Sequence, residues 1–183
     1  TYLPIRPDTN QVLNLGERYT IELPAGWAAK PNVPGFVVLA KAHSFGPLNG
    51  QLTGYRNIKM GHFATTAPTA LGEPTDLSDI DSFVQSPPEP LVVDEITTVQ
   101  FGDREALRFD IGFDPAVDCS DAMPCAFAFS TGRGLVGQFR SGFDMRVWWV
   151  DLDDGESIAF VTSATDAEEL DEIQLVVETI RFG

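Results

Sequence analysis

The side chains most suited to chemistry lie in an acidic run at residues 151–156, which reads Asp-Leu-Asp-Asp-Gly-Glu. Carboxylate oxygens are ligands that calcium prefers, so Asp151, Asp153 and Asp154 form a candidate calcium site. The run has neither the twelve-residue spacing nor the final bidentate acid of an EF-hand. An Asp-Gly pair between two apolar runs is also a strong signal of a hairpin turn. We therefore favour a turn over a metal site, and no cofactor is predicted.

The two cysteines, Cys119 and Cys125, lie in a polar stretch rich in turn-forming residues. Two thiolates without a nearby histidine leave a tetrahedral metal site half empty, so metal binding is not indicated. A local disulfide would stabilise the fold by about 2 kcal/mol and would indicate an oxidising compartment. Two free thiols in a cytosolic protein are the alternative. The sequence favours the disulfide and, with it, an extracytoplasmic location.

Two histidines, His43 and His62, are the residues best suited to general acid–base catalysis. Ser44 adjoins His43, but neighbours in sequence rarely place a nucleophile and its base correctly, and no Gly-x-Ser-x-Gly motif occurs. Carboxylate pairs could serve a glycosidase, yet 27 acidic residues produce such pairs by chance. A hydrolase that uses carboxylates, His43 or His62 is therefore an alternative to a protein without catalysis.

The glycine-rich run at residues 132–137 matches the dinucleotide-binding pattern G-x-G-x-x-G. That motif requires a helix that begins inside it and presents backbone N–H groups to a pyrophosphate. The residues that follow include Ser141-Gly142 and leave too little chain for such a helix. A flexible turn between strands is the better interpretation.

A cluster of cationic and aromatic residues, Arg140, Arg146, Trp148 and Trp149, is the candidate binding surface. Arginine and tryptophan are enriched at interface hot spots. The favoured alternative is that both tryptophans belong to the core and the arginines pair with nearby acids.

The chain has 183 residues and a net charge of −15, with 43% apolar residues, which suffices for a sizeable core. Residues 1–91 carry 8 acids and 6 bases, whereas residues 92–183 carry 19 acids and 6 bases. This charge repels phosphate backbones, so nucleic acid is not an expected partner. No apolar run is long enough to span a bilayer. The chain begins at Thr1, and we expect that an upstream signal peptide or membrane anchor was removed.

The elements that must position these residues follow from hydrophobic periodicity. Residues 1–16 are an extended lead-in, and residues 17–183 form a single α+β domain. Strands are expected at residues 19–23, 36–40, 55–63 and 126–130, a hairpin at 96–113, and a short helix at 76–84. Residues 43–54 are expected to be a loop. Because strands follow one another through short turns, we predict an antiparallel sheet with helices on one or both faces.

The last third of the chain has the clearest sequence patterns. Two apolar runs flank the acidic turn, so residues 146–163 are a predicted hairpin. Successive strand side chains point to opposite faces, so Trp148 and Trp149 cannot share a face, and helices are expected on both faces of the sheet. From Thr165 or Asp166 onward, an apolar stripe predicts a helix that extends to Ile180.

Residues 19–27, which read Tyr-Thr-Ile-Glu-Leu-Pro-Ala-Gly-Trp, and a closing helix from Leu170 to Phe182 give the chain a resemblance to the PsbP-like fold. That family includes the extrinsic photosystem subunit and actinobacterial envelope lipoproteins. The resemblance covers residues 17–183 and implies an α/β/α sandwich, usually exported and usually an accessory or binding module. It implies no site residues.

The sequence thus favours a non-catalytic extracytoplasmic domain, secreted or membrane-tethered, that binds a protein or a cell-envelope component. Two alternatives are the hydrolase and a small-molecule sensor. A flat apolar patch near Trp148 would favour a binding module, a deep pocket with perturbed carboxylates an enzyme, and a closed apolar cavity between sheet and helix a sensor.

Overall fold

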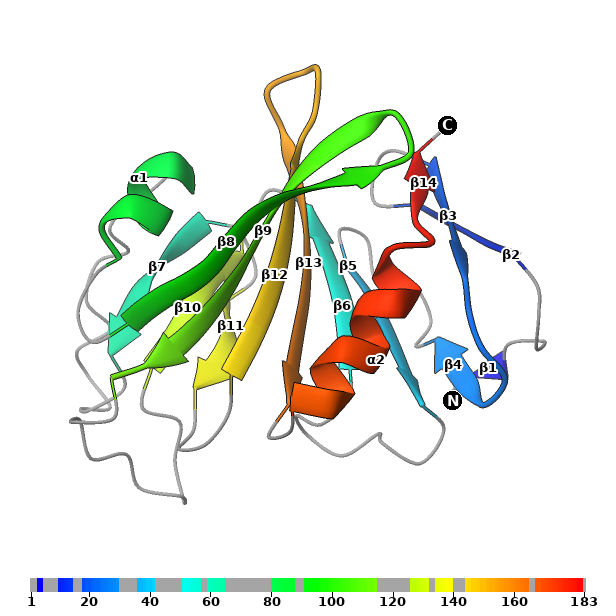
Figure 1. The fold of residues 1–183 in the computed structure, drawn as a ribbon, viewed down its shortest axis with the longest axis horizontal. Coiled ribbons are helices and arrows are strands. Elements are labelled where there is room, and N and C mark those ends of the chain that lie inside the picture. The colour runs from blue at the N-terminus through cyan, green and yellow to red at the C-terminus, as the bar shows by residue number, and fades with distance from the viewer. Residues whose placement is uncertain are drawn as a thin grey trace.

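The computed structural model describes residues 3–4, 10–14, 18–29, 36–41, 51–56, 59–64, 80–87, 91–114, 126–131, 134–139, 144–164 and 167–182. Within these ranges the chain forms two helices and three antiparallel sheets (Figure 1). The helices are α1 (Ile80–Gln85) and α2 (Ala167–Val177). The strands are β1 (Leu3–Pro4), β2 (Asn10–Asn14), β3 (Arg18–Glu22), β4 (Trp27–Ala29), β5 (Phe36–Lys41), β6 (Gln51–Arg56), β7 (Lys59–Ala64), β8 (Leu91–Phe101), β9 (Arg104–Phe113), β10 (Ala126–Thr131), β11 (Gly134–Phe139), β12 (Asp144–Asp151), β13 (Ser157–Ala164) and β14 (Arg181–Phe182). The fold is therefore α+β with an antiparallel sheet, as predicted.

The largest sheet has eight strands in the order β1-β4-β5-β6-β13-β12-β9-β8. Two smaller sheets have the orders β11-β10-β7 and β14-β3-β2. The hairpin predicted around the acidic turn is confirmed as β12 and β13, and Gly155 adopts a φ of 79° in the turn. The hairpin predicted at residues 96–113 is also confirmed, although β8 begins earlier, at Leu91.

The adjacent tryptophans of β12 are buried on opposite faces of the large sheet. Trp148 joins a core cluster with Phe160 of β13 and Ile173 of α2. Trp149 joins a separate cluster with Phe83 of α1 and Phe109 of β9. The prediction that the two indoles lie on different faces is confirmed, and apolar residues cover both of them.

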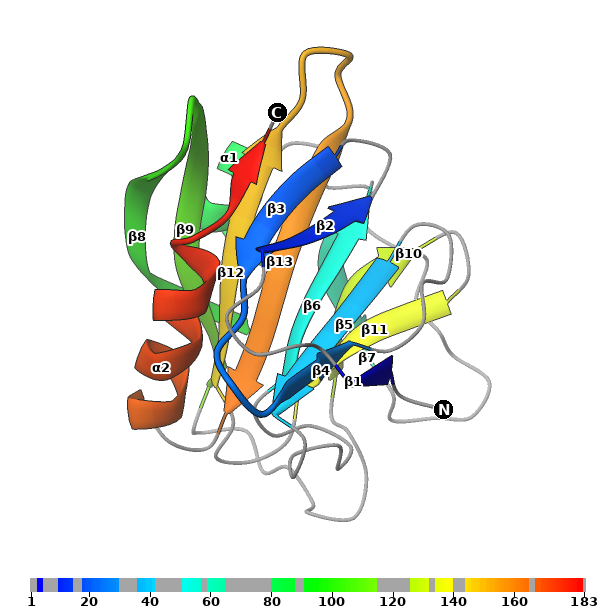
Figure 2. The ribbon, with the colours of Figure 1, turned by 90° about the vertical axis from the view of Figure 1, so that its right-hand side faces the viewer.

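Helix α2 packs on the Trp148 face because its apolar side chains recur at helical spacing. Leu170, Ile173 and Val177 are buried, and the helix lies over β13 (Figure 1). β3 crosses the same face beside α2 (Figure 2), where the ring of Tyr19 contacts that of Phe160. These contacts fix α2 to both the large sheet and β3.

The prediction that α2 extends to Ile180 is wrong at its end. The helix stops at Val177, the chain turns, and Arg181–Phe182 pairs with Thr20 and Tyr19 of β3. Ile180 is fully buried, like the other residues of the apolar stripe, but it lies beyond the end of the helix. Pairing with a strand from the start of the chain ends the helix, and local periodicity does not reveal that pairing.

Several strands differ from their predicted limits. The expected loop at residues 43–54 ends in β6, which begins at Gln51, and the expected strand at 55–63 divides into β6 and β7. The predicted lead-in contributes β2, which pairs with β3 along its length. The predicted short helix is described from Ile80 to Gln85. No helix in the described ranges is long and apolar enough to cross a membrane.

Candidate binding groove

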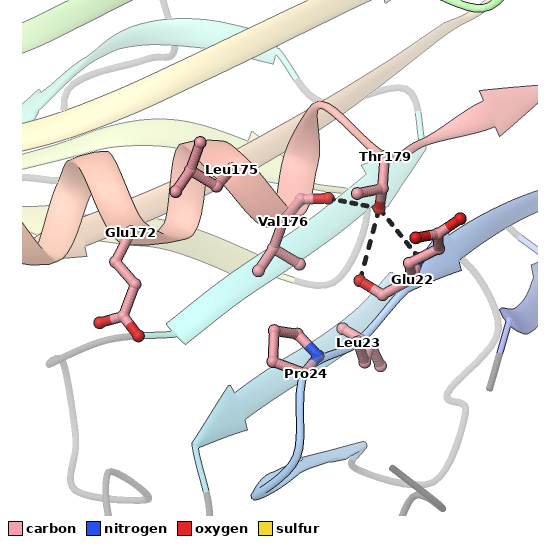
Figure 3. Close-up of a pocket in the computed structure, with 7 residues that line it drawn as sticks. All are labelled: Glu22, Leu23, Pro24, Glu172, Leu175, Val176 and Thr179. Atoms are coloured by element: carbon pink, nitrogen blue, oxygen red, sulfur yellow. Dashed lines mark hydrogen bonds between the residues drawn. The ribbon is translucent and has the colours of Figure 1, made fainter. Parts of the chain in front are cut away.

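A surface groove of about 700 Å³ lies between α2 and the segment that follows β3 (Figure 3). Its lining residues come from two segments distant in sequence: Glu22, Leu23 and Pro24 from the β3 end, and Glu172, Leu175, Val176 and Thr179 from the α2 end. The volume is within the range usual for ligand sites. The groove combines an apolar centre with carboxylates.

Polar contacts join the two sides of the groove near its ends. The Glu22 N–H donates to Thr179 Oγ1 at 2.9 Å, and the Thr179 hydroxyl lies 2.7 Å from the Val176 carbonyl oxygen. Lys41 of β5 pairs with Glu172 of α2. The Glu22–Thr179 and Lys41–Glu172 contacts therefore join the α2 end to β3 and β5.

The apolar part of the groove has a buried floor and an exposed rim. Leu23 and Val176 are 2% and 3% exposed, whereas Leu175 is 66% exposed. Leu175 faces outward because it lies off the inward stripe of Leu170, Ile173 and Val177. A large apolar side chain at the mouth of a groove gives a partner an apolar contact.

The three calcium candidates take other partners. The Trp149 indole N–H donates to Asp151 Oδ1 at 2.8 Å, and Asp153 pairs with Arg104 at 3.2 Å. Asp154 accepts from the Glu156 N–H, as expected for a turn. The described side chains contain no group of three or more residues arranged to hold a metal ion. The structure therefore supports the turn at residues 151–156.

Arg146 and Trp148, predicted as candidate binding residues, lie in the interior. Trp148 is 0% exposed and Arg146 is 9% exposed. The guanidinium donates to both carboxylate oxygens of Asp110, at 2.8 and 2.9 Å, and to Asp171 and Gln174 of α2. The hydrogen bonds with Asp110 raise the pKa of Arg146, while burial lowers it. The favoured alternative, core tryptophans and an acid-paired arginine, is what the structure has.

Other predicted site residues fall outside what the structure describes. Cys119, Cys125, Arg140 and His43 are not among the described residues, so the disulfide and the first histidine stay predictions. His62 lies on β7. In the glycine-rich run, β11 spans Gly134–Phe139, so a strand occupies the place where the dinucleotide motif requires a helix.

The sequence did not indicate Leu175, Leu23 or Pro24 as site residues. The available signal was Leu175 itself, an apolar residue off the helical stripe. The site also requires β3 and α2 to lie close together, and residue spacing does not predict that proximity.

No family model matches the chain, and no curated protein matches it. Among solved structures, the chain is similar to a protein from Bacteroides thetaiotaomicron VPI-5482, with 8% sequence identity and a TM-score of 0.45. The match covers 90% of this chain and 45% of that one, so this chain spans less than half of that protein. A similarity of this level carries no argument about fold or function.

Proposed function

We propose that this protein is a non-catalytic binding module whose groove beside α2 holds an apolar side chain of a protein or cell-envelope component. The observation that carries the proposal is Leu175, two-thirds exposed on the rim of a groove of about 700 Å³. A partner side chain seated in the groove would remove Leu175 and the apolar floor beside it from water, which is favourable.

The charges around the groove favour a cationic group next to the apolar side chain. Glu22 and Glu172 are among the lining residues, and Lys41 pairs with Glu172. The whole chain carries −15, which attracts cationic partners over longer distances. The partner we propose therefore presents leucine-like side chains beside lysine or arginine.

The location and the finer fold belong to the same proposal. An extracytoplasmic module, secreted or anchored, is supported by the close spacing of Cys119 and Cys125 in sequence. An α/β/α sandwich of the PsbP-like kind is supported by α1 and α2, whose apolar residues join clusters on opposite faces of the sheet.

Backbone amide shifts measured by NMR test the groove. The probe is a blocked peptide in which leucines are flanked by lysines, titrated into the whole chain. We expect shift changes at Leu23, Val176 and Thr179, and their loss in Leu175→Gln. Ile96→Gln is the matched control, because Ile96 is 47% exposed but lies on β8. No shift changes at Leu23, Val176 and Thr179, or equal binding at the groove by Leu175→Gln, would contradict the proposal.

A further inference from the structure

Among the described strands, β8 is an edge strand of the large sheet. It pairs with β9 and lies at the end of the strand order. Figure 2 shows it at the border of the sheet, next to β9. An edge strand presents backbone N–H and C=O groups that another chain can pair with.

The regular part of this edge is residues 97–101. A bulge between Asp94 and Thr97 interrupts the pairing, and Glu95 there adopts a φ of 51°. Beyond it, Thr97 to Phe101 pair without a shift with Arg108 to Arg104. The bulge limits pairing by a partner strand to the section next to the turn.

The hairpin register shows which backbone groups face outward. Gly102, with a φ of 67°, begins a two-residue turn flanked by the pair Phe101 and Arg104. Hydrogen-bonded and non-hydrogen-bonded pairs alternate along an antiparallel ladder. A two-residue hairpin turn is closed by a hydrogen-bonded pair, so the N–H and C=O groups of Thr98 and Gln100 point away from β9.

An acidic hollow of about 440 Å³ adjoins this edge, and Thr98 is one of its lining residues. Its other lining side chains include Leu107, which is paired with Thr98, and Trp149. Five carboxylates and one guanidinium line it: Asp81, Asp103, Glu105, Asp151, Asp153 and Arg104. Arg104 pairs with Asp153, and the four other carboxylates leave the hollow with a net negative charge.

We propose that the β8 edge accepts an extended segment of another protein, with lysine or arginine at alternate positions, as an added strand. Main-chain hydrogen bonds would provide affinity, and alternate side chains would enter the space next to Thr98. Because strand side chains alternate between faces, every second residue of the partner lies on the face of the acidic hollow. This surface is separate from the groove beside α2 and does not depend on it.

A second copy of this chain does not fit the same edge. Each copy carries −15, and β8 itself contains Asp94 and Glu95 but no lysine or arginine. Pairing two such edges brings like charges together, which opposes association. Charge complementarity thus selects a basic partner.

The test uses two blocked peptides, one alternating valine with lysine and one alternating valine with glutamate. We expect the lysine peptide to bind the whole chain and to slow amide hydrogen exchange at Thr98 and Gln100. Thr98→Pro removes an outward N–H without removing a β8–β9 hydrogen bond, and should weaken binding roughly tenfold or more. Thr98→Ala, which keeps the N–H, should bind as the parent does.

A double variant tests the same proposal without a proline substitution. Asp103→Asn with Glu105→Gln should weaken binding of the lysine peptide and reduce its salt dependence, because both carboxylates line the hollow. Leu175→Gln should leave this binding unchanged, which separates the β8 edge from the groove. Equal binding of the glutamate peptide, equal affinity of folded Thr98→Pro and Thr98→Ala, or a dimer that Thr98→Pro dissociates would each overturn the proposal.

Discussion

Two stripes of helix α2 and its C-terminal turn have the same spacing but meet different neighbours. The closed stripe is Asp171, Gln174 and Glu178, and its side chains bond to Arg146, Arg108 and one another. The open stripe, one residue further along, is Glu172, Leu175 and Thr179, which lines the groove. Residues three and seven apart share a helix face, so a shift by one residue decides which neighbours each stripe meets.

The difference shows how the protein separates stability from a binding surface. The closed stripe meets a buried guanidinium whose hydrogen bonds hold α2 against the sheet. The open stripe is tied through Glu172 and Thr179, which leaves Leu175 between them two-thirds exposed. Variants of Arg146, the guanidinium that the closed stripe contacts, should therefore change folding, and variants at Leu175 should change binding.

The largest effect is expected for Arg146→Leu. It leaves Asp110, whose side chain is 14% exposed, without its bidentate partner. Removing one member of a buried ion pair typically costs about 3–5 kcal/mol of unfolding free energy. Denaturant unfolding measures the loss.

Two further variants check the cause. Arg146→Leu with Asp110→Leu should recover most of the stability, because no unpaired charge remains. Asp171→Ala should cost less than about 1 kcal/mol, since its side chain is 75% exposed. A double variant as unstable as the single one would show that charge burial is not the cause.

The next prediction concerns Tyr19 and Tyr55, which pack in the two apolar clusters. Burial raises the pKa of Tyr19 and raises that of Tyr55 to about 12. Above about pH 10 the unfolded chain loses these protons first, so stability falls as the pH rises through each raised pKa. Below that pH both states are protonated and this contribution is fully present.

Tyrosinate absorbance and denaturant midpoints, followed together across alkaline pH, check this prediction. Tyr19→Phe and Tyr55→Phe assign the two signals. Full ionisation of both residues at the ordinary tyrosine pKa in the folded protein would contradict it.

How much of this could be predicted depends on how local each signal is. The stripe of Leu170, Ile173 and Val177 predicted α2, and the parity of Trp148 and Trp149 placed them on opposite faces. The end of α2 depends on the pairing of Arg181 with Thr20, and the groove depends on Leu23 near Val176. Such contacts join the two ends of the chain, so no local pattern encodes them.

Arg146 shows the same limit in a binding prediction. Arginine next to tryptophan is typical of hot spots, but burial depends on what covers the strand. Asp110 lies opposite Arg146 on β9, and α2 completes its partners. Neither neighbour is evident from the residues around position 146.

A smaller loss of stability is expected at Thr179, which joins the two sides of the groove. Thr179→Val replaces the hydroxyl that bonds to Glu22 and Val176 with a methyl group, and should cost about 1 kcal/mol. Thr179→Ser keeps the hydroxyl and should be closer to the parent. Thermal unfolding distinguishes the two variants. Equal losses of stability would show that the Thr179 hydroxyl does not contribute.

The smallest effect on folding is expected for Leu175→Gln. An exposed side chain outside the core typically changes the unfolding free energy by less than about 0.5 kcal/mol. Denaturant unfolding of this variant should overlay that of the parent. A loss as large as that of Arg146→Leu would mean that Leu175 belongs to the core.

The most direct test of the central claim compares the two stripes in one binding measurement. Isothermal titration calorimetry gives the affinity of the leucine–lysine peptide for the parent, Asp171→Ala and Leu175→Gln. The account predicts that Leu175→Gln weakens binding about tenfold, the value of one partly buried leucine contact, while Asp171→Ala binds as the parent does. Equal affinity for all three proteins, or a larger loss in Asp171→Ala, would contradict it.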